Sequence, residues 1–409
     1  MAVKPAKQKK LTKTTSGFGI SIFDSIDFVN PAHWNSVLNA ENLFLSIPYL
    51  QAMESTPPLN MRYRYAIMYQ EKKPAAIAYF QIVHLTGGSV IPVDPEHKET
   101  NRLKDNLKKF LIKQSENVST MVLICGNAFV SGENGFHYSK DVDPDAAFKA
   151  LADAMYRIRK GEKLNGEITT VMLKDFYDHT TAYSDIFKKF KYRHFKVEPA
   201  MALDMERSWT SFDAYMSSLA SRYRSRVKAI RKKGSALVIK DLGWEEIKEQ
   251  AQRIEELYNF VHLKAGFRLA TFIQDYFWAM KKKLPANFGL TAYYLDGRMV
   301  GFRTTFKDKH FAEAHFIGLD YAVNREYELY QNILYDYVNE AIELQVKQLH
   351  LGRTASEIKS TLGAKAHDLT CYVRRSNPVE NKIMKPFIGL IKPSEWEPRN
   401  PFKAGATKD

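Results

Sequence analysis

One short run of the sequence places an acid and a base on the same side of a predicted strand. The run from His310 to Asp320 alternates in the way that is typical of a β-strand. This alternation puts Glu313 and His315 on one face, and Ala314 and Phe316 on the other. A histidine with a pKa near ~6.5 can deprotonate an amine, and a neighbouring carboxylate can share that task. We predict a catalytic pair here; the alternative is a polar pair that satisfies buried neighbours.

A loop after the short predicted strand KQLHL carries groups that suit an anion. The segment LGRTASEIKS contains Arg353, Thr354 and Lys359, and ligands of α/β sheets gather at the carboxyl ends of strands. Arginine and lysine have the chemistry to hold a phosphate or a carboxylate. Ser356 is the expected N-cap of the brief helix that follows. We predict a substrate or donor site in this loop, with structural ion pairs as the alternative.

A second glycine-containing loop, CGNAFVSGENGF, follows a predicted buried strand. Its glycines would let backbone N–H groups approach a ligand, but Asp141, Asp143 and Asp145 at the next helix would repel phosphate. A loop that binds substrate or that is merely structural is therefore favoured. Asn127 is its best single candidate for a polar contact.

One predicted helix is strongly basic. Between Phe212 and Lys233 an apolar stripe is surrounded by seven arginines and lysines, among them Arg224 and Lys228. Such a helix can face donor phosphates, tRNA or lipid headgroups. The alternative is a surface helix whose stripe packs on the core while its charges lie in water.

Composition limits the class of protein. The chain has 409 residues, is 45% hydrophobic and 13% aromatic, and carries a net charge of +14, which favours polyanionic partners. Its two cysteines, Cys125 and Cys371, lie in apolar strand patterns and are expected to be buried and reduced. No Cys/His spacing suits zinc, so no metal is predicted. The amino terminus lacks the apolar segment of a secretion signal, which predicts a cytoplasmic protein.

The elements that must position these residues follow a recognisable order. Asp296-Gly297 predicts a two-residue hairpin, and a second turn at Asp308-Lys309 leads into the strand with Glu313. A long amphipathic helix around Tyr330, a short strand, a brief helix and a last strand complete the series. The first half repeats much of this logic, including a predicted helix over 102–114.

We therefore predict an α/β protein with two tandem acetyltransferase-like domains, each a mixed central sheet flanked by helices. The predicted boundaries give a basic disordered arm (1–19), an N-terminal domain (20–200), a C-terminal domain (206–375) and a proline-containing tail (376–409).

Several segments resemble the FemAB-like branch of the GNAT superfamily. The similarity is carried by YLDGRMVGF, IGLDYAVNREYELYQNILYDYVNEAI and LHLGRTASEIKSTLGA, by the basic helix before them, and by ENLFLSIPYLQAME and CGNAFVSGENGF. It covers about residues 23 to 375. The resemblance implies an acyltransferase whose donor lies where two central strands separate. The glycine signature that usually holds the donor pyrophosphate is missing after IGLDYAVN.

The resemblance also implies what the candidate residues do. The protein would transfer an acyl group from acyl-CoA or an acyl carrier protein, used as co-substrate without a permanently bound cofactor, to a lipid-like amine such as a sphingoid base. Tyr330 could protonate the thiolate leaving group, with Tyr327 as its competitor. Contact with the inner face of the membrane or with a carrier protein would fit this reading.

Two other functions stay open. One is an aminoacyl-tRNA-dependent peptidyltransferase of cell-wall synthesis, disfavoured because the helices over 244–264 and 272–283 are too short for a coiled-coil arm. The other is a non-catalytic protein that binds RNA or membranes on a degenerate GNAT fold.

Overall fold

The architecture was obtained as a computed structural model of the full chain. It describes residues 16–39, 42–86, 119–264, 275–388, 391 and 393–405, and everything below concerns these residues. The predicted basic arm (except for its last residues) and the helix predicted over 102–114 lie outside them. Within them, no helix is long and apolar enough to cross a membrane.

The strands of both halves belong to one sheet. The first half contributes β1 (Gly19–Phe23), β2 (Met61–Gln70), β3 (Lys73–Thr86), β4 (Ser119–Cys125), β5 (Phe136–Tyr138), β6 (Ile168–Tyr177) and β7 (Arg193–Asp204). The second half contributes β8 (Val238–Asp241), β9 (Phe288–Leu295), β10 (Arg298–Lys307), β11 (Phe311–Leu319), β12 (Gln348–His350) and β13 (Lys365–Arg375). Their order is β1-β2-β3-β4-β6-β13-β7-β12-β11-β10-β9-β8, with β5 beside β3.

Each half contains the same series of neighbours. β2, β3 and β4 are antiparallel and β6 lies parallel to β4, just as β9, β10 and β11 are antiparallel and β12 lies parallel to β11. Both series begin with a two-residue hairpin. In the second half Asp296 and Gly297 have φ of 50° and 78°, as predicted; in the first half Glu71 and Lys72 have φ of 49° and 67°. The predicted mixed α/β class with two acetyltransferase-like halves is confirmed.

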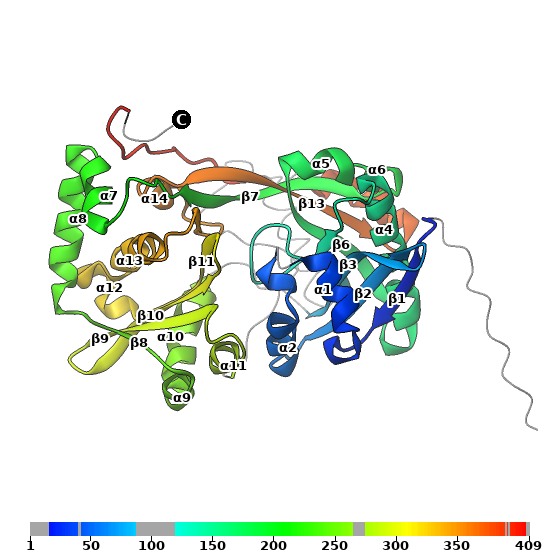
Figure 1. Ribbon diagram of the computed structural model, residues 1–409, viewed down its shortest axis with the longest axis horizontal. Helices are drawn as coiled ribbons and strands as arrows, with labels where there is room; N and C mark the ends of the chain where they lie inside the picture. Colours follow the sequence, from blue (N-terminus) through cyan, green and yellow to red (C-terminus); the bar gives the residue numbers. More distant parts are fainter. Residues whose placement is uncertain are drawn as a thin grey trace, which may run out of the picture.

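Two long strands join the halves. β13, the last strand of the chain, lies between β6 and β7, and β7 pairs with β13 along most of its length and with β12 at its end. Figure 1 shows β7 and β13 crossing from one half to the other. The two central sheets expected from the sequence are thus one continuous sheet. The domain limits at 20–200 and 206–375 stay a prediction.

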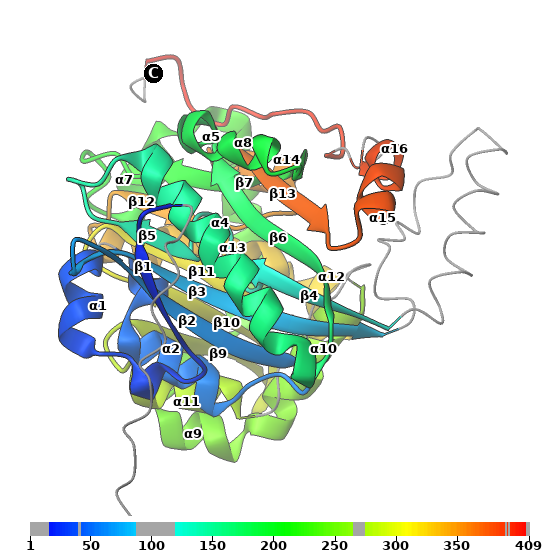
Figure 2. The ribbon, with the colours of Figure 1, turned by 90° about the vertical axis from the view of Figure 1, so that its right-hand side faces the viewer.

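Three apolar cores surround this sheet, and the helices form the outer and central layers (Figures 1 and 2). The outer face of the first half is covered by α4 (Pro144–Gly161), α5 (Asp178–Ser184) and α6 (Ile186–Lys189). The outer face of the second half is covered by α7 (Phe212–Ser218), α8 (Ser221–Lys233), α12 (Tyr321–Tyr327) and α13 (Leu329–Glu343). Between the halves lie α1 (Pro31–Leu38), α2 (Ile47–Ser55), α9 (Trp244–Glu249), α10 (Ala251–Lys264) and α11 (Tyr276–Lys283).

The central core contains side chains from both halves. Tyr49 of α2 packs edge-on against Phe306 of β10, with ring centroids 5.6 Å apart, and Phe44 lies 5.3 Å from the same ring. Such aromatic pairs stabilise a contact by about 0.5–1.5 kcal/mol beyond their buried area. The halves are therefore held together by packing as well as by the shared strands. The remaining helices are α14 (Ser356–Ser360), α15 (Pro378–Ile383) and α16 (Lys385–Ile388).

Two predicted helices are divided in the structure. The basic helix breaks at Leu219 and Ala220 into α7 and α8, and the helix over 244–264 breaks at Gln250 into α9 and α10. After β11, a left-handed φ of 47° at Glu328 separates α12 from α13, and α13 is the long helix predicted to open at Tyr330. Amphipathic periodicity continues across such breaks, so it does not reveal them.

Candidate active site

A cavity of about 510 Å³ lies between the two halves and contains most of the predicted site. It is lined by the loop Ala128–Ser131 of the first half and by residues of α10, β11, α12, α13 and the loop after β12. Glu313, His315, Tyr330, Arg353, Thr354 and Lys359 all line it. The structure thus brings six of the nine predicted site residues to one cavity.

The cavity opens where two parallel strands part. β11 pairs with β12 only at Phe311, Ala312 and Glu313, and then continues to Leu319 without β12 beside it. The edge of β11 beyond Glu313 therefore has backbone groups that β12 does not bind. A substrate with amide groups can hydrogen-bond to such an edge in the way that another strand would.

A β-bulge shapes the floor of the cavity. Between Arg303 and Thr305 of β10 the pairing skips from Ile317 to Ala314, so β11 has an extra residue there. The hydroxyl of Thr304 accepts from Phe316 N (2.9 Å) and donates to its carbonyl oxygen (3.2 Å). The bulge turns Phe316 to the central core, whereas simple alternation had placed it beside Ala314. That part of the strand prediction was wrong, because one inserted residue shifts the period.

Glu313 has a partner that sequence reasoning missed. Its carboxylate lies 3.0 Å from Nδ1 of His350 on β12, and Nε2 of His350 lies 2.8 Å from Gln348 Oε1. Burial would lower the pKa of His350, but the hydrogen bond and charge of Glu313 outweigh it and raise that pKa. Glu313 itself is 3% exposed. A carboxylate and an imidazole joined in this way can accept a proton from a substrate amine.

His315 does not have the ionisation expected for a general base. Burial lowers its pKa to about 3, so the ring is neutral at physiological pH. Its Nε2 lies 2.8 Å from the Tyr276 hydroxyl, and its ring packs 4.8 Å from that of Phe306. Its Nδ1 is buried without a hydrogen-bond partner in the described structure. The assumption of an ordinary pKa for His315 was wrong, because the aromatic residues that bury it come from distant segments.

Lys359 is a buried amine beside the acid. Burial lowers its pKa to about 8 although the charge of Glu313 opposes the shift. Its Nζ donates to the carbonyl oxygen of Arg353 at 2.7 Å. Lys359 lies on α14, whose N-cap is Ala355; Ser356 is the first helical residue and makes no capping bond, which corrects the predicted cap. A lysine with this pKa can both hold and release a proton near pH 8.

Arg353 is oriented by the first half of the chain. Its guanidinium donates to Oδ1 of Asp175 at 3.2 Å, and Oδ2 of the same carboxylate binds Lys174. Asp175 is fully buried, whereas the Arg353 side chain is 28% exposed and reaches the cavity. Thr354 and Ala355 follow with left-handed φ of 67° and 49°. Two successive non-glycine residues in this region store backbone strain, which is more common at functional sites.

The first turn of α13 differs from an open anion site. The side chain of Asn324 accepts a hydrogen bond from Tyr330 N at 2.9 Å. Glu328, the residue just before α13, brings a carboxylate to the same end of the helix. One of the N–H groups that could hold a phosphate is therefore already bound. Tyr330 lines the cavity, and burial raises the pKa of its hydroxyl to about 12. Tyr327, its predicted competitor, does not line the cavity.

The remaining three candidates lie elsewhere. Asn127 is fully buried, donates to the Tyr49 hydroxyl at 2.7 Å and accepts from Phe129 N at 3.0 Å, so it fixes the loop that lines the cavity. Arg224 and Lys228 lie on α8, outside the set of residues that line the cavity. Their role as an anion-binding face stays a prediction.

The glycines of the first-half loop serve a contact within the chain. The loop leaves the sheet after β4 and returns at β5, and at its neck a Cβ on Gly135 would lie 2.2 Å from Gly126 N. Glycine is required because the two backbones touch. The glycines therefore close a narrow neck, and the loop presents Ala128–Ser131 to the cavity.

The strand order and the parting strands define a GNAT-type α/β fold that occurs twice along the chain. The sequence matches no protein-family model and no curated protein. Among solved structures, the crystal structure of FemX is similar over 89% of this chain and 100% of that chain, with a TM-score of 0.54 and 11% identity. A tandem GNAT protein from the clavulanic acid biosynthesis pathway is similar over 88% and 99%, with a TM-score of 0.50 and 10% identity.

A third match has a lower score. The C-terminal domain of a putative lysylphosphatidylglycerol synthetase from Agrobacterium fabrum covers 87% of this chain and 94% of its own length, with a TM-score of 0.46 and 9% identity. The first two matches establish the fold and, at 10–11% identity, leave the substrate open.

Proposed function

We propose that this protein is an N-acyltransferase that moves an acyl group from a thioester to an amine in the cavity between its halves. The observation that carries the proposal is the separation of β11 from β12 directly after Glu313. This places a free strand edge, a carboxylate paired with histidine, and a buried lysine in one cavity. Acyl transfer needs such groups: a proton acceptor, donors for the oxyanion, and a way to position the thioester.

In the proposed reaction Glu313 accepts a proton, and Lys359 donates one. The acceptor ammonium first releases one proton to water. The neutral amine nitrogen attacks the thioester carbonyl, and as the C–N bond forms its second proton passes to Glu313, with His350 sharing the charge. The C–S bond then breaks. The leaving thiolate takes a proton from the Lys359 ammonium, whose pKa of about 8 is close to that of a thiol, ~8.5. Tyr330 remains a second proton donor, but its raised pKa makes it the weaker acid.

Two donors fit this cavity. Acyl-CoA and an acyl carrier protein present the same pantetheine thioester, whose amide groups can bind the free edge of β11. The Asn324 side chain and Glu328 at the start of α13 disfavour a pyrophosphate there. This supports a donor whose phosphates lie outside the cavity, and it favours the carrier protein over CoA.

The acceptor in this proposal is a lipid-like amine such as a sphingoid base. Much of the cavity surface is apolar, with contributions from Phe129, Val130, Phe316, Ile317 and Leu319. Burying a hydrocarbon chain there would contribute about 0.8 kcal/mol per methylene group. Glu313 can hold the ammonium end of the same molecule before it is deprotonated.

The decisive experiment combines purified protein with an acyl donor and an amine. Palmitoyl-CoA and palmitoyl carrier protein are supplied separately with sphinganine, and amide formation and thiol release are followed by mass spectrometry and a thiol reagent. We expect one mole of thiol per mole of amide, without added RNA and after ribonuclease treatment. Amide that forms only with aminoacyl-tRNA would replace this proposal by the peptidyltransferase function, and no amide with any donor would favour a non-catalytic role.

A further inference from the structure

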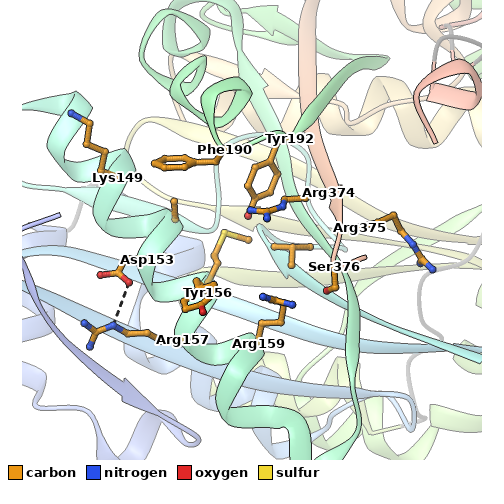
Figure 3. A pocket seen from close by; sticks show the side chains of 13 residues that line it. Lys149, Asp153, Tyr156, Arg157, Arg159, Phe190, Tyr192, Arg374, Arg375 and Ser376 are labelled. Carbon is orange, nitrogen blue, oxygen red and sulfur yellow. Dashed lines mark hydrogen bonds and ion pairs between the residues drawn. The ribbon is translucent and has the colours of Figure 1, made fainter. Parts of the chain in front are cut away.

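A second concave surface lies on the outer face of the first half, where the proposed reaction does not use it. This groove has a volume of about 660 Å³ and runs beside α4, Val171 of β6 and the end of β13. Figure 3 shows its side chains, with Tyr156 and Arg159 coming from α4 and Arg374 coming from β13. Its size is within the range of small-molecule sites, about 300–1,000 Å³.

The charged side chains of the groove are mostly cationic. It contains five cations, namely Lys149, Arg157, Arg159, Arg374 and Arg375, and a single carboxylate, Asp153. Asp153 binds Arg157 at 3.4 Å, and Arg375 is held by Glu380 outside the groove at 2.6 Å. Among the described residues, Lys149, Arg159 and Arg374 have no carboxylate within 4.0 Å. Their charge attracts an anion, since no neighbouring acid offsets it.

The arginines are also positioned by aromatic rings. The guanidinium of Arg374 lies 5.8 Å from the centre of the Tyr192 ring, and that of Arg159 lies 5.4 Å from the centre of the Tyr156 ring. Planar guanidinium groups held in this way bind phosphate oxygens through paired hydrogen bonds. The groove therefore has two oriented phosphate-binding groups instead of loosely placed charges.

Aromatic surface remains exposed beside these charges. Tyr156 is 52% exposed and Phe190 is 38% exposed, and both line the groove. An exposed ring next to an arginine is suited to stack on a planar base, as in proteins that bind nucleotides. The Ser376 hydroxyl, also in the groove, already donates to the carbonyl oxygen of Ile168 at 2.7 Å.

We propose that this groove binds a nucleotide-sized ligand, a phosphate ester that carries a planar aromatic base. Arg159 and Arg374 bind its phosphates, and Tyr156 and Phe190 stack against its base. A single compact groove with two arginines that lack an ion pair among the described residues fits one nucleotide, whereas a polynucleotide track would require cations spread along a longer path. The proposal is independent of the acyltransfer reaction, because none of these residues lines the cavity between the halves.

Binding of ADP to the full-length protein tests this site directly by isothermal titration calorimetry at low salt. We expect saturable binding, with adenosine and pyrophosphate each binding more weakly than ADP. Arg159→Gln and Arg374→Gln should each weaken ADP binding about tenfold or more, since each removes a charged hydrogen bond to phosphate. Tyr156→Ala should weaken it about tenfold through loss of stacking.

Matched controls separate this site from others. Arg226→Gln on α8 removes one exposed arginine that has no ion pair among the described residues, and it should leave ADP affinity unchanged. Thermal melting of each variant confirms folding. The proposal is overturned if ADP does not bind, if Arg353→Gln abolishes binding while the groove variants do not, or if oligoadenylate binds and ADP does not.

Discussion

The two halves of this protein differ in how far their parallel strand pair stays joined, β4 with β6 in the first half and β11 with β12 in the second. In the second half β11 runs on for six residues beyond Glu313, its last residue paired with β12, and a cavity opens between the separated strands. In the first half β4 stays paired with β6 up to its last residue, where Cys125 faces Leu173. The chain then leaves the sheet as a loop and returns as β5, which continues beside β3. The second half thus forms the cavity between its separated strands, and the loop of the first half lines one side of that cavity.

The comparison also concerns the charged groups near each strand end. In the second half Glu313 faces the cavity with His350, and in the first half Glu133 accepts from Tyr177 N at 2.8 Å. Burial raises the pKa of Glu133 although its hydrogen bonds oppose the shift. Glu313 is buried on β11 and bonds to the His350 imidazole beside a free strand edge, whereas Glu133 is half-buried in the loop after β4. The difference predicts where the chemistry takes place.

Removal of the second-half acid should have the largest effect. Glu313→Gln keeps the shape of the side chain and removes its ability to accept a proton, so turnover should fall by roughly 10²–10⁴-fold. The matched variant Glu133→Gln retains an acceptor for Tyr177 N and should keep most of the activity. Turnover numbers with saturating thioester and amine measure both. Equal losses in the two variants would mean that the halves do not differ in the way proposed.

The two buried lysines should respond in opposite directions. Lys174→Met leaves the buried carboxylate of Asp175 without one of its two cations, and removing one partner of a buried pair costs about 3–5 kcal/mol in unfolding free energy. Among the residues that the structure describes, no carboxylate bonds to Lys359, so Lys359→Met should stabilise the protein at pH 7 by on the order of 1–3 kcal/mol. Urea denaturation at fixed pH measures both.

Lys359→Met should also slow the reaction, since it removes the proton donor for the thiolate. In the unmodified protein kcat should fall as the pH rises through about 8, because the ammonium form is lost. The Met variant should lack this alkaline limb. A stabilised variant with an unchanged pH profile would exclude Lys359 from the proton transfer.

Acid should destabilise the second half through His315. Its pKa is lowered to about 3 in the folded protein, whereas an unfolded histidine titrates near ~6.5. Stability from the neutral ring is therefore complete above pH ~6.5 and declines as the pH falls toward 3, by about 1.4 kcal/mol per pH unit. His315→Gln should remove this part of the slope. The control is His84→Gln, a change of an exposed histidine on β3, and a denaturation series from pH 7 to 4 compares the two variants.

The smallest expected difference lies in the two hairpins. Gly297→Ala places a Cβ at φ 78° and should destabilise the β9–β10 hairpin by about 1 kcal/mol. Lys72→Gly relieves the same strain at φ 67° in the β2–β3 hairpin and should stabilise it by up to about 1 kcal/mol. Midpoints of thermal unfolding should shift in opposite directions. Shifts of the same sign would show that the two turns are not equivalent.

The sequence by itself determined the local elements and much of the fold. The Asp296-Gly297 hairpin, the alternation that puts Glu313 and His315 on one face, and the apolar stripe of α13 depend on neighbours a few residues apart. Local geometry is encoded by such short-range patterns. The order of these elements predicted an acetyltransferase-like α/β protein, and six of the residues singled out from the sequence line one cavity in the structure.

Only the tertiary structure decided the partners, the burial and the ionisation of those residues. His350 meets Glu313 through a strand pairing 37 positions apart, and Asp175 meets Arg353 across 178 positions. His315 becomes a neutral ring because Tyr276 and Phe306 enclose it from other elements. The position of β13 between β6 and β7 likewise depends on long-range pairing. Alternation tells which face a side chain takes; its partners, burial and pKa come from segments that the periodicity of one strand cannot identify.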